Sequence, residues 1–136
     1  MTNSIALTDH DKTTLAVAAH GAIALITAAG VKSAGKIAVA GSLALASATG
    51  PVGHALDEKQ KGLKLDGKTT AELADQVFPA LTASVALLKE QDLAAADDFR
   101  STVLTAVEAG ARAERGGTGP AMTEMIRKIT NALDAA

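Results

Sequence analysis

The sequence predicts an all-α protein, a single-domain bundle of about five helices with a central neutral hairpin rich in alanine and glycine. The chain has 136 residues, a length that suits one domain with its own core. Apolar residues make up 48% of the chain and charged residues 21%, which is a globular composition. Aromatic residues make up only 1%, so the core must be built from Leu, Ile, Val and Ala. Abundant alanine favours closely packed helices over a sheet.

The hairpin is predicted from residues 13–56, where charged side chains are nearly absent. No residue of fixed charge lies between Lys12 and Lys32, and Lys36 is the only one between Lys32 and Asp57. A stretch this neutral must be covered by the later helices, by a second copy of the chain or by lipid.

The first helix is predicted at 9–29, with Gly30 as its stop. Thr8 and Asp11 have the spacing of a capping box, although Asp takes the place of the preferred Glu or Gln. Because this helix is neutral on every side, we expect it at the centre of the bundle.

The second helix is predicted to begin after Ser33 and to end before Gly50 and Pro51. Residues 37–40 and 43–46 alternate as in a strand, but alanine is a poor strand former and a good helix former. Residues 50–68, interrupted by Gly53, Gly62 and Gly67, are predicted as a connection that holds at most a short helical turn near 54–60.

Three amphipathic helices are predicted in the rest of the chain. Thr69 and Glu72 form a capping box that opens the third helix, in which Pro79 should cause a kink or a split. Asp92 caps the fourth helix, which Gly116 and Gly117 end, and Pro120 starts the fifth. Their predicted apolar faces are Leu73, Val77, Leu81, Val85 and Leu88; Ala96, Phe99, Val103, Val107 and Gly110; and Met122, Ile126, Ile129 and Leu133.

Net charge and cysteine content exclude several classes of function. A net charge of -2 gives no general attraction to nucleic acid or to anionic membranes. The absence of cysteine excludes disulfides, thiolate metal sites and cysteine nucleophiles. The N-terminal residues lack the features of a signal peptide, so we expect a cytoplasmic protein.

A hairpin of 13–29 and 37–56 is long enough to cross a bilayer twice, but its small residues and missing aromatic belt make membrane insertion unfavourable.

One phosphate-binding pattern occurs by spacing alone. Residues 30–36, GVKSAGK, match GxxxxGK, but Ile37 replaces the Ser or Thr that would hold magnesium, and a helix rather than a strand precedes the pattern. We therefore interpret these residues as a turn between two helices.

Two histidines are the candidate ligand-binding side chains. His20 lies within the first helix, and His54 lies in the connection, where Glu58 could complete a metal or small-molecule site. The favoured interpretation of His20 is an interior histidine that makes a hydrogen bond, because a buried imidazole needs a polar partner.

Two segments resemble the tellurite-resistance protein B family of helical proteins. Residues 66–73, DGKTTAEL, are similar to the turn and capped helix of that family, and 103–129, with Glu124, are similar to its helix-turn-helix unit. The chain also resembles small bacterial helical proteins with no assigned activity. The resemblance implies a helical fold, a role in stress response and a metal site at Asp66, Glu72 and Glu124. Lys32 stands in a turn where the family pattern would place an acidic residue.

Two functions follow as hypotheses. The first is a non-enzymatic protein that acts by self-association, as a homodimer, or by binding another protein. Its interface would lie on the first two helices, at Ile23, Ile37 and Leu43. The second is a small-molecule or metal-binding protein, with or without enzymatic activity, whose pocket lies around His20 and His54. The sequence identifies no cofactor for either function.

Overall fold

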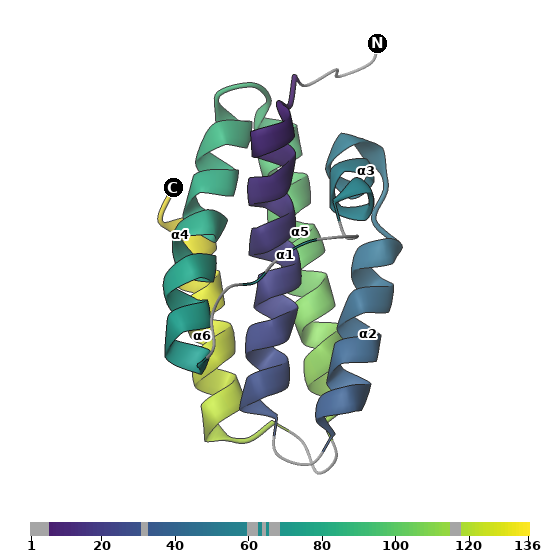
Figure 1. Cartoon of the computed structure of the whole chain (residues 1–136), viewed down its shortest axis with the longest axis vertical. Helices are drawn as coiled ribbons and strands as arrows, with labels where there is room; N and C mark the ends of the chain where they lie inside the picture. Colours follow the sequence, from purple (N-terminus) through teal and green to yellow (C-terminus); the bar gives the residue numbers. More distant parts are fainter. Residues whose placement is uncertain (1–5, 31–32, 60–62, 64, 66–68, 115–117) are drawn as a thin grey trace.

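The computed structural model describes residues 6–30, 33–59, 63, 65, 69–114 and 118–136. Within them the chain forms six α-helices and no strand (Figure 1). The all-α prediction is confirmed, with one helix more than expected. The helices are α1 (Asp9–Ala29), α2 (Ala34–Ala46), α3 (Gly50–Glu58), α4 (Thr70–Lys89), α5 (Leu93–Arg112) and α6 (Pro120–Asp134).

Helix α1 is the central element, as its neutral sequence predicted. The Thr8 side chain accepts a hydrogen bond from the backbone N–H of Asp11, and the Asp11 carboxylate accepts one from the backbone N–H of Thr8. This capping box fixes the start of the helix, and both predicted ends are confirmed. α1 contacts each of the other five helices, and Figure 1 shows it between α2 on one side and α4 with α6 on the other.

The prediction of a central hairpin is wrong for its second arm, because α2 lies at the edge of the bundle. Figure 1 places α2 at the side opposite α4 and α6, with α3 beyond its C-terminal end. α2 packs against α5 and α1, which leaves its outer side open. The contact with α5 is close, since a Cβ atom added to Gly110 would lie 3.2 Å from Cγ2 of Ile37.

The predicted second helix corresponds to α2, and the additional helix, α3, lies in the predicted connection. α2 ends at Ala46, and α3 begins at Gly50, whose φ of 77° is a left-handed value that favours glycine. Pro51 disfavours helical backbone at the residue before it, so the helix cannot run on unbroken. The predicted connection at 50–68 therefore contains a nine-residue helix, and Val52, Ala55 and Leu56 bury its inner face.

The three C-terminal helices have the predicted starts. The capping box of Thr69 and Glu72 opens α4, Asp92 accepts a hydrogen bond from the backbone N–H of Ala94 at the start of α5, and Pro120 lies in the first turn of α6. α5 ends at Arg112, and the predicted stop at 116–117 lies outside the described residues. All predicted facing residues are buried except Leu73 and Ile126, which are half-buried.

Pro79 does not divide α4, which is continuous over Thr70–Lys89. Proline removes one backbone donor and crowds the turn before it. The Pro79 ring is exposed, while Val77 and Leu81 on either side of it are fully buried. The core contacts on both sides of the proline thus hold the helix together.

Two helices, α1 and α4, are long and apolar enough to cross a membrane by length and composition. Core helices of a folded bundle have the same features, and half of the most apolar window of α1 is buried inside the bundle. The two-span hairpin considered from the sequence is not formed here, because α2 has only 13 residues and a span needs about 20. That the protein does not insert into membranes stays a prediction.

Candidate functional site

His20 is a half-buried residue of α1 whose ring contacts α3. Its Nε2 atom lies 3.2 Å from the backbone oxygen of Leu56. Because a carbonyl oxygen can only accept, Nε2 must carry a proton and donate this hydrogen bond. Burial lowers the pKa of His20, and the hydrogen bond to Leu56 opposes that change without cancelling it. The prediction of a hydrogen-bonded histidine is confirmed, and the neutral ring joins α3 to α1.

We expect the stability of the protein to fall as the pH drops from 7 to 5. Burial lowers the pKa of His20 in the folded state, so the unfolded chain binds a proton more readily, with a pKa near 6.5. The stability contributed by neutral His20 is therefore complete above about pH 6.5 and is lost below it, by at most about 1.4 kcal/mol per pH unit. Urea denaturation at a series of pH values measures this slope.

His20→Gln is the test variant, since Gln keeps an N–H donor for the Leu56 oxygen and does not titrate. It should flatten the slope between pH 7 and 5. Equal slopes in the unchanged protein and His20→Gln would show that His20 does not contribute to the pH dependence.

The other residues of the predicted histidine pocket do not face His20. The side chain of His54 is 78% exposed, and its Nε2 atom lies 3.8 Å from Oε1 of Glu58, one turn later on α3. Glu58 also accepts from Nζ of Lys12 at 3.2 Å, and Lys59 pairs with Asp9. These ion pairs fasten α3 to the start of α1. The arrangement is that of a helix attachment rather than a ligand pocket.

The metal-binding residues implied by the family resemblance have separate partners where they are described. Asp66 lies outside the described residues. Glu72 accepts from the backbone N–H of Thr69 at 3.1 Å, as part of the α4 cap. Glu124 pairs with Arg127, whose hydrogen bond lowers the pKa of the Glu124 carboxyl group. In the described part of the chain, no three His, Asp or Glu residues gather as metal ligands would.

The three predicted interface residues occupy different environments. Ile23 and Ile37 are core residues: Ile23 lies against Gly41 of α2, and Ile37 lies against Gly110 of α5. Neither can reach a second molecule while the bundle is closed. Leu43, by contrast, is 64% exposed on the outer side of α2.

Leu43 belongs to an apolar strip that we call the α2 outer face, defined by Gly35, Val39 and Leu43. These residues are four positions apart, so they lie on one side of the helix. Val39 is 60% exposed. With Lys36 and Ala40 they line an open hollow of about 600 Å³. Among the described residues, only one other large apolar side chain, Leu93, is exposed.

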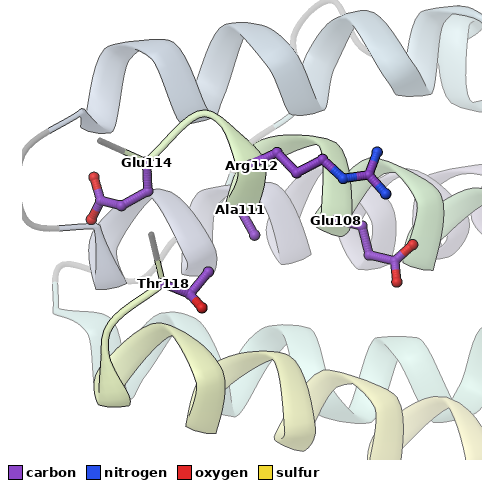
Figure 2. A pocket seen from close by; sticks show the side chains of 5 residues that line it. All are labelled: Glu108, Ala111, Arg112, Glu114 and Thr118. Atoms are coloured by element: carbon purple, nitrogen blue, oxygen red, sulfur yellow. The ribbon is translucent and has the colours of Figure 1, made fainter. Parts of the chain in front are cut away.

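A second hollow, of about 410 Å³, lies at the end of α5 and is polar (Figure 2). Glu108, Ala111, Arg112, Glu114 and Thr118 line it. Figure 2 shows the Arg112 side chain extending toward Glu108, whereas the Glu114 carboxylate points away from both. Glu114 is only 6% exposed, and it accepts a hydrogen bond from the backbone N–H of Ser33 at 3.0 Å.

This contact gives Glu114 a structural role that the sequence did not indicate. Ser33 precedes α2 and makes no capping hydrogen bond with its own side chain. A carboxylate at a helix N-terminus satisfies an unpaired N–H group and interacts favourably with the helix dipole. Because this carboxylate comes from the segment just after α5, 81 positions later, no local pattern could reveal it. Glu114 thus helps to form the polar hollow and also caps the start of α2.

The fold and these sites together define a six-helix all-α bundle, counted over the described residues, with one apolar helix face open to solvent. Comparison of the chain with protein-family models, with curated proteins and with solved structures finds no match.

Proposed function

We propose that this protein is a non-enzymatic helical protein that acts by self-association, and that its homodimer forms through the α2 outer face. The observation that supports this most is the exposure of Val39 and Leu43, at 60% and 64%, on one side of one helix. Single exposed apolar residues are ordinary on protein surfaces, whereas adjoining ones on an open face are typical of interaction sites.

Electrostatics favour a neutral partner for this face. Between residues 37 and 56 the sequence has no Asp, Glu, Lys or Arg, so most of α2 and α3 can meet a second copy without desolvating a charge. A lipid surface fits less well, because α2 has no aromatic residue and only Lys36 as a basic one.

The size of the face sets the expected strength of association. A helix of 13 residues is about 20 Å long, and α2 exposes only two large apolar side chains, so we expect an interface below the roughly 1,200 Å² at which specific, stable interfaces begin. We therefore expect a reversible dimer that forms at micromolar concentrations rather than a permanent one.

Leu43→Glu is expected to abolish dimer formation, because it puts a carboxylate into the apolar contact. Sedimentation equilibrium over the micromolar range should show monomer and dimer for the unchanged protein and monomer alone for Leu43→Glu. Leu93→Glu is the matched control: Leu93 is 67% exposed but lies at the start of α5, away from the α2 outer face, so its variant should still dimerise. Circular dichroism checks that both variants keep their helices.

Two results would contradict the proposal. One is an unchanged protein that stays monomeric at several hundred micromolar. The other is flotation of the unchanged protein with lipid vesicles that is lost in Leu43→Glu, which would assign the α2 outer face to a membrane. The histidine-pocket alternative has no comparable support, since His20 and His54 have different partners.

A further inference from the structure

We infer that the two copies pair through antiparallel α2 helices, with a two-fold axis at Val39 and with Leu43 of each copy seated over Gly35 of the other. This inference rests on the proposed self-association and adds its geometry. It assigns a separate role to each of the three residues of the α2 outer face.

The α2 outer face is complementary to itself because its three residues increase in size from one end to the other. A Cβ atom added to Gly35 would meet no described heavy atom within 4 Å, so Gly35 leaves open space at one end of the face. Leu43 projects at the other end, and Val39 lies midway, four positions from each. In a two-fold interface residue i contacts residue j and j contacts i. Antiparallel pairing about Val39 therefore places each leucine in the space left by the other copy's glycine.

The position of the single charge in α2 favours the same orientation. Lys36 is the only charged residue of Ala34–Ala46. Parallel pairing in register would bring two Lys36 ammonium groups together, which is unfavourable in an apolar contact. Antiparallel pairing sends them to opposite ends, each beside the partner's Ser42, which lies three positions beyond Val39 as Lys36 lies three before it. It also sets the two helix dipoles in opposite directions.

Disulfide trapping can determine which residues of the two α2 helices face each other, because the chain contains no cysteine of its own. Packed helices have axes about 8–10 Å apart, and each Cα atom lies about 2.3 Å from its axis, so facing residues come within disulfide reach. In the antiparallel pair the two Leu43 Cα atoms are displaced by eight residues, or about 12 Å, along the axis. That separation is beyond disulfide reach.

The experiment oxidises cysteine variants of the full chain under mild conditions and follows the band on non-reducing gels. Val39→Cys should move from 13.6 kDa to twice that mass, and reductant should reverse the shift. Leu43→Cys alone and Gly35→Cys alone should stay at the monomer mass, whereas a mixture of these two variants should give a crosslinked heterodimer. Leu93→Cys, exposed but outside the face, is the control and should stay monomeric.

The possible outcomes separate this inference from the proposed function. A crosslink in Leu43→Cys without any second variant, whether or not Val39→Cys also crosslinks, would overturn the antiparallel register. Leu43-dependent dimerisation in sedimentation would then still support self-association. No crosslink in any variant, with a dimer in sedimentation, would place the dimer contact away from Val39 and also overturn the inference. No crosslink and no dimer would overturn the proposed function itself.

Discussion

Phe99→Ala is expected to lower the free energy of unfolding by about 3–5 kcal/mol. Phe99 is fully buried in α5 and is one of only two aromatic residues in the chain. The other buried residues of the core are Leu, Ile, Val, Ala and one Met, and its many alanines are too short to fill the space left by a phenyl ring. The domain is expected to have about 5–15 kcal/mol in total, so this one change removes a large part of it. Urea denaturation followed by circular dichroism measures the loss.

The second phenylalanine provides the matched control. Phe78 is half-buried on α4, beside a surface hollow that Pro79 and Thr82 also line. Phe78→Ala removes the same atoms, but it leaves an opening that water can enter rather than a closed cavity, so the loss should be clearly smaller. Equal losses in the two variants would mean that Phe99 does not occupy the closed core described above.

Gly21→Ala is expected to cost about 1–3 kcal/mol of stability, although alanine is the better helix former. A Cβ atom at Gly21 would lie 2.4 Å from Cγ2 of Val77 and 3.3 Å from its Cγ1. Valine has one strongly preferred rotamer in a helix, so the side chain cannot turn aside easily. α1 and α4 would have to move apart along their shared core. Thermal and urea unfolding report the change.

Two further variants test whether crowding against Val77 causes the loss of stability in Gly21→Ala. Gly21→Ala combined with Val77→Ala should lose much less stability than the sum of the two single changes, because Val77→Ala removes the atoms in the way. Gly35→Ala, on the open side of α2, should keep or raise stability, by up to about 1 kcal/mol. Strict additivity of the first pair would contradict the close approach of α1 and α4.

The starts of most helices could be predicted because local residues decide them. Thr8 with Asp11, Thr69 with Glu72, and Asp92 satisfy backbone groups of the next turn, so the sequence next to each helix contains the needed information. The buried faces of α4, α5 and α6 were predicted for the same kind of reason, since their apolar residues recur at helical spacing.

The position of α2 could not be predicted, because its neutral residues surround the helix on all sides and mark no inner face. The face of α2 that is buried depends on a later helix, α5. Because Gly110 has no side chain, α5 can approach Ile37 of α2 closely. The partner of His20 could not be predicted either, because it too lies on an element far away in the sequence. The need of His20 for a polar partner was predictable, but its partner, the backbone oxygen of Leu56, is a group that every residue has.

The hydrogen bond between Ser33 and Glu114 has a consequence for the order in which the chain is completed during synthesis. The start of α2 is capped by Glu114, which the ribosome adds 81 residues after Ser33. Until then, the newly made N-terminal half carries α1 and α2 without the helices that enclose them, and its apolar surface stays open to chaperones or to aggregation. Distant pairings of this kind also slow folding, because a long loop must close before the contact forms.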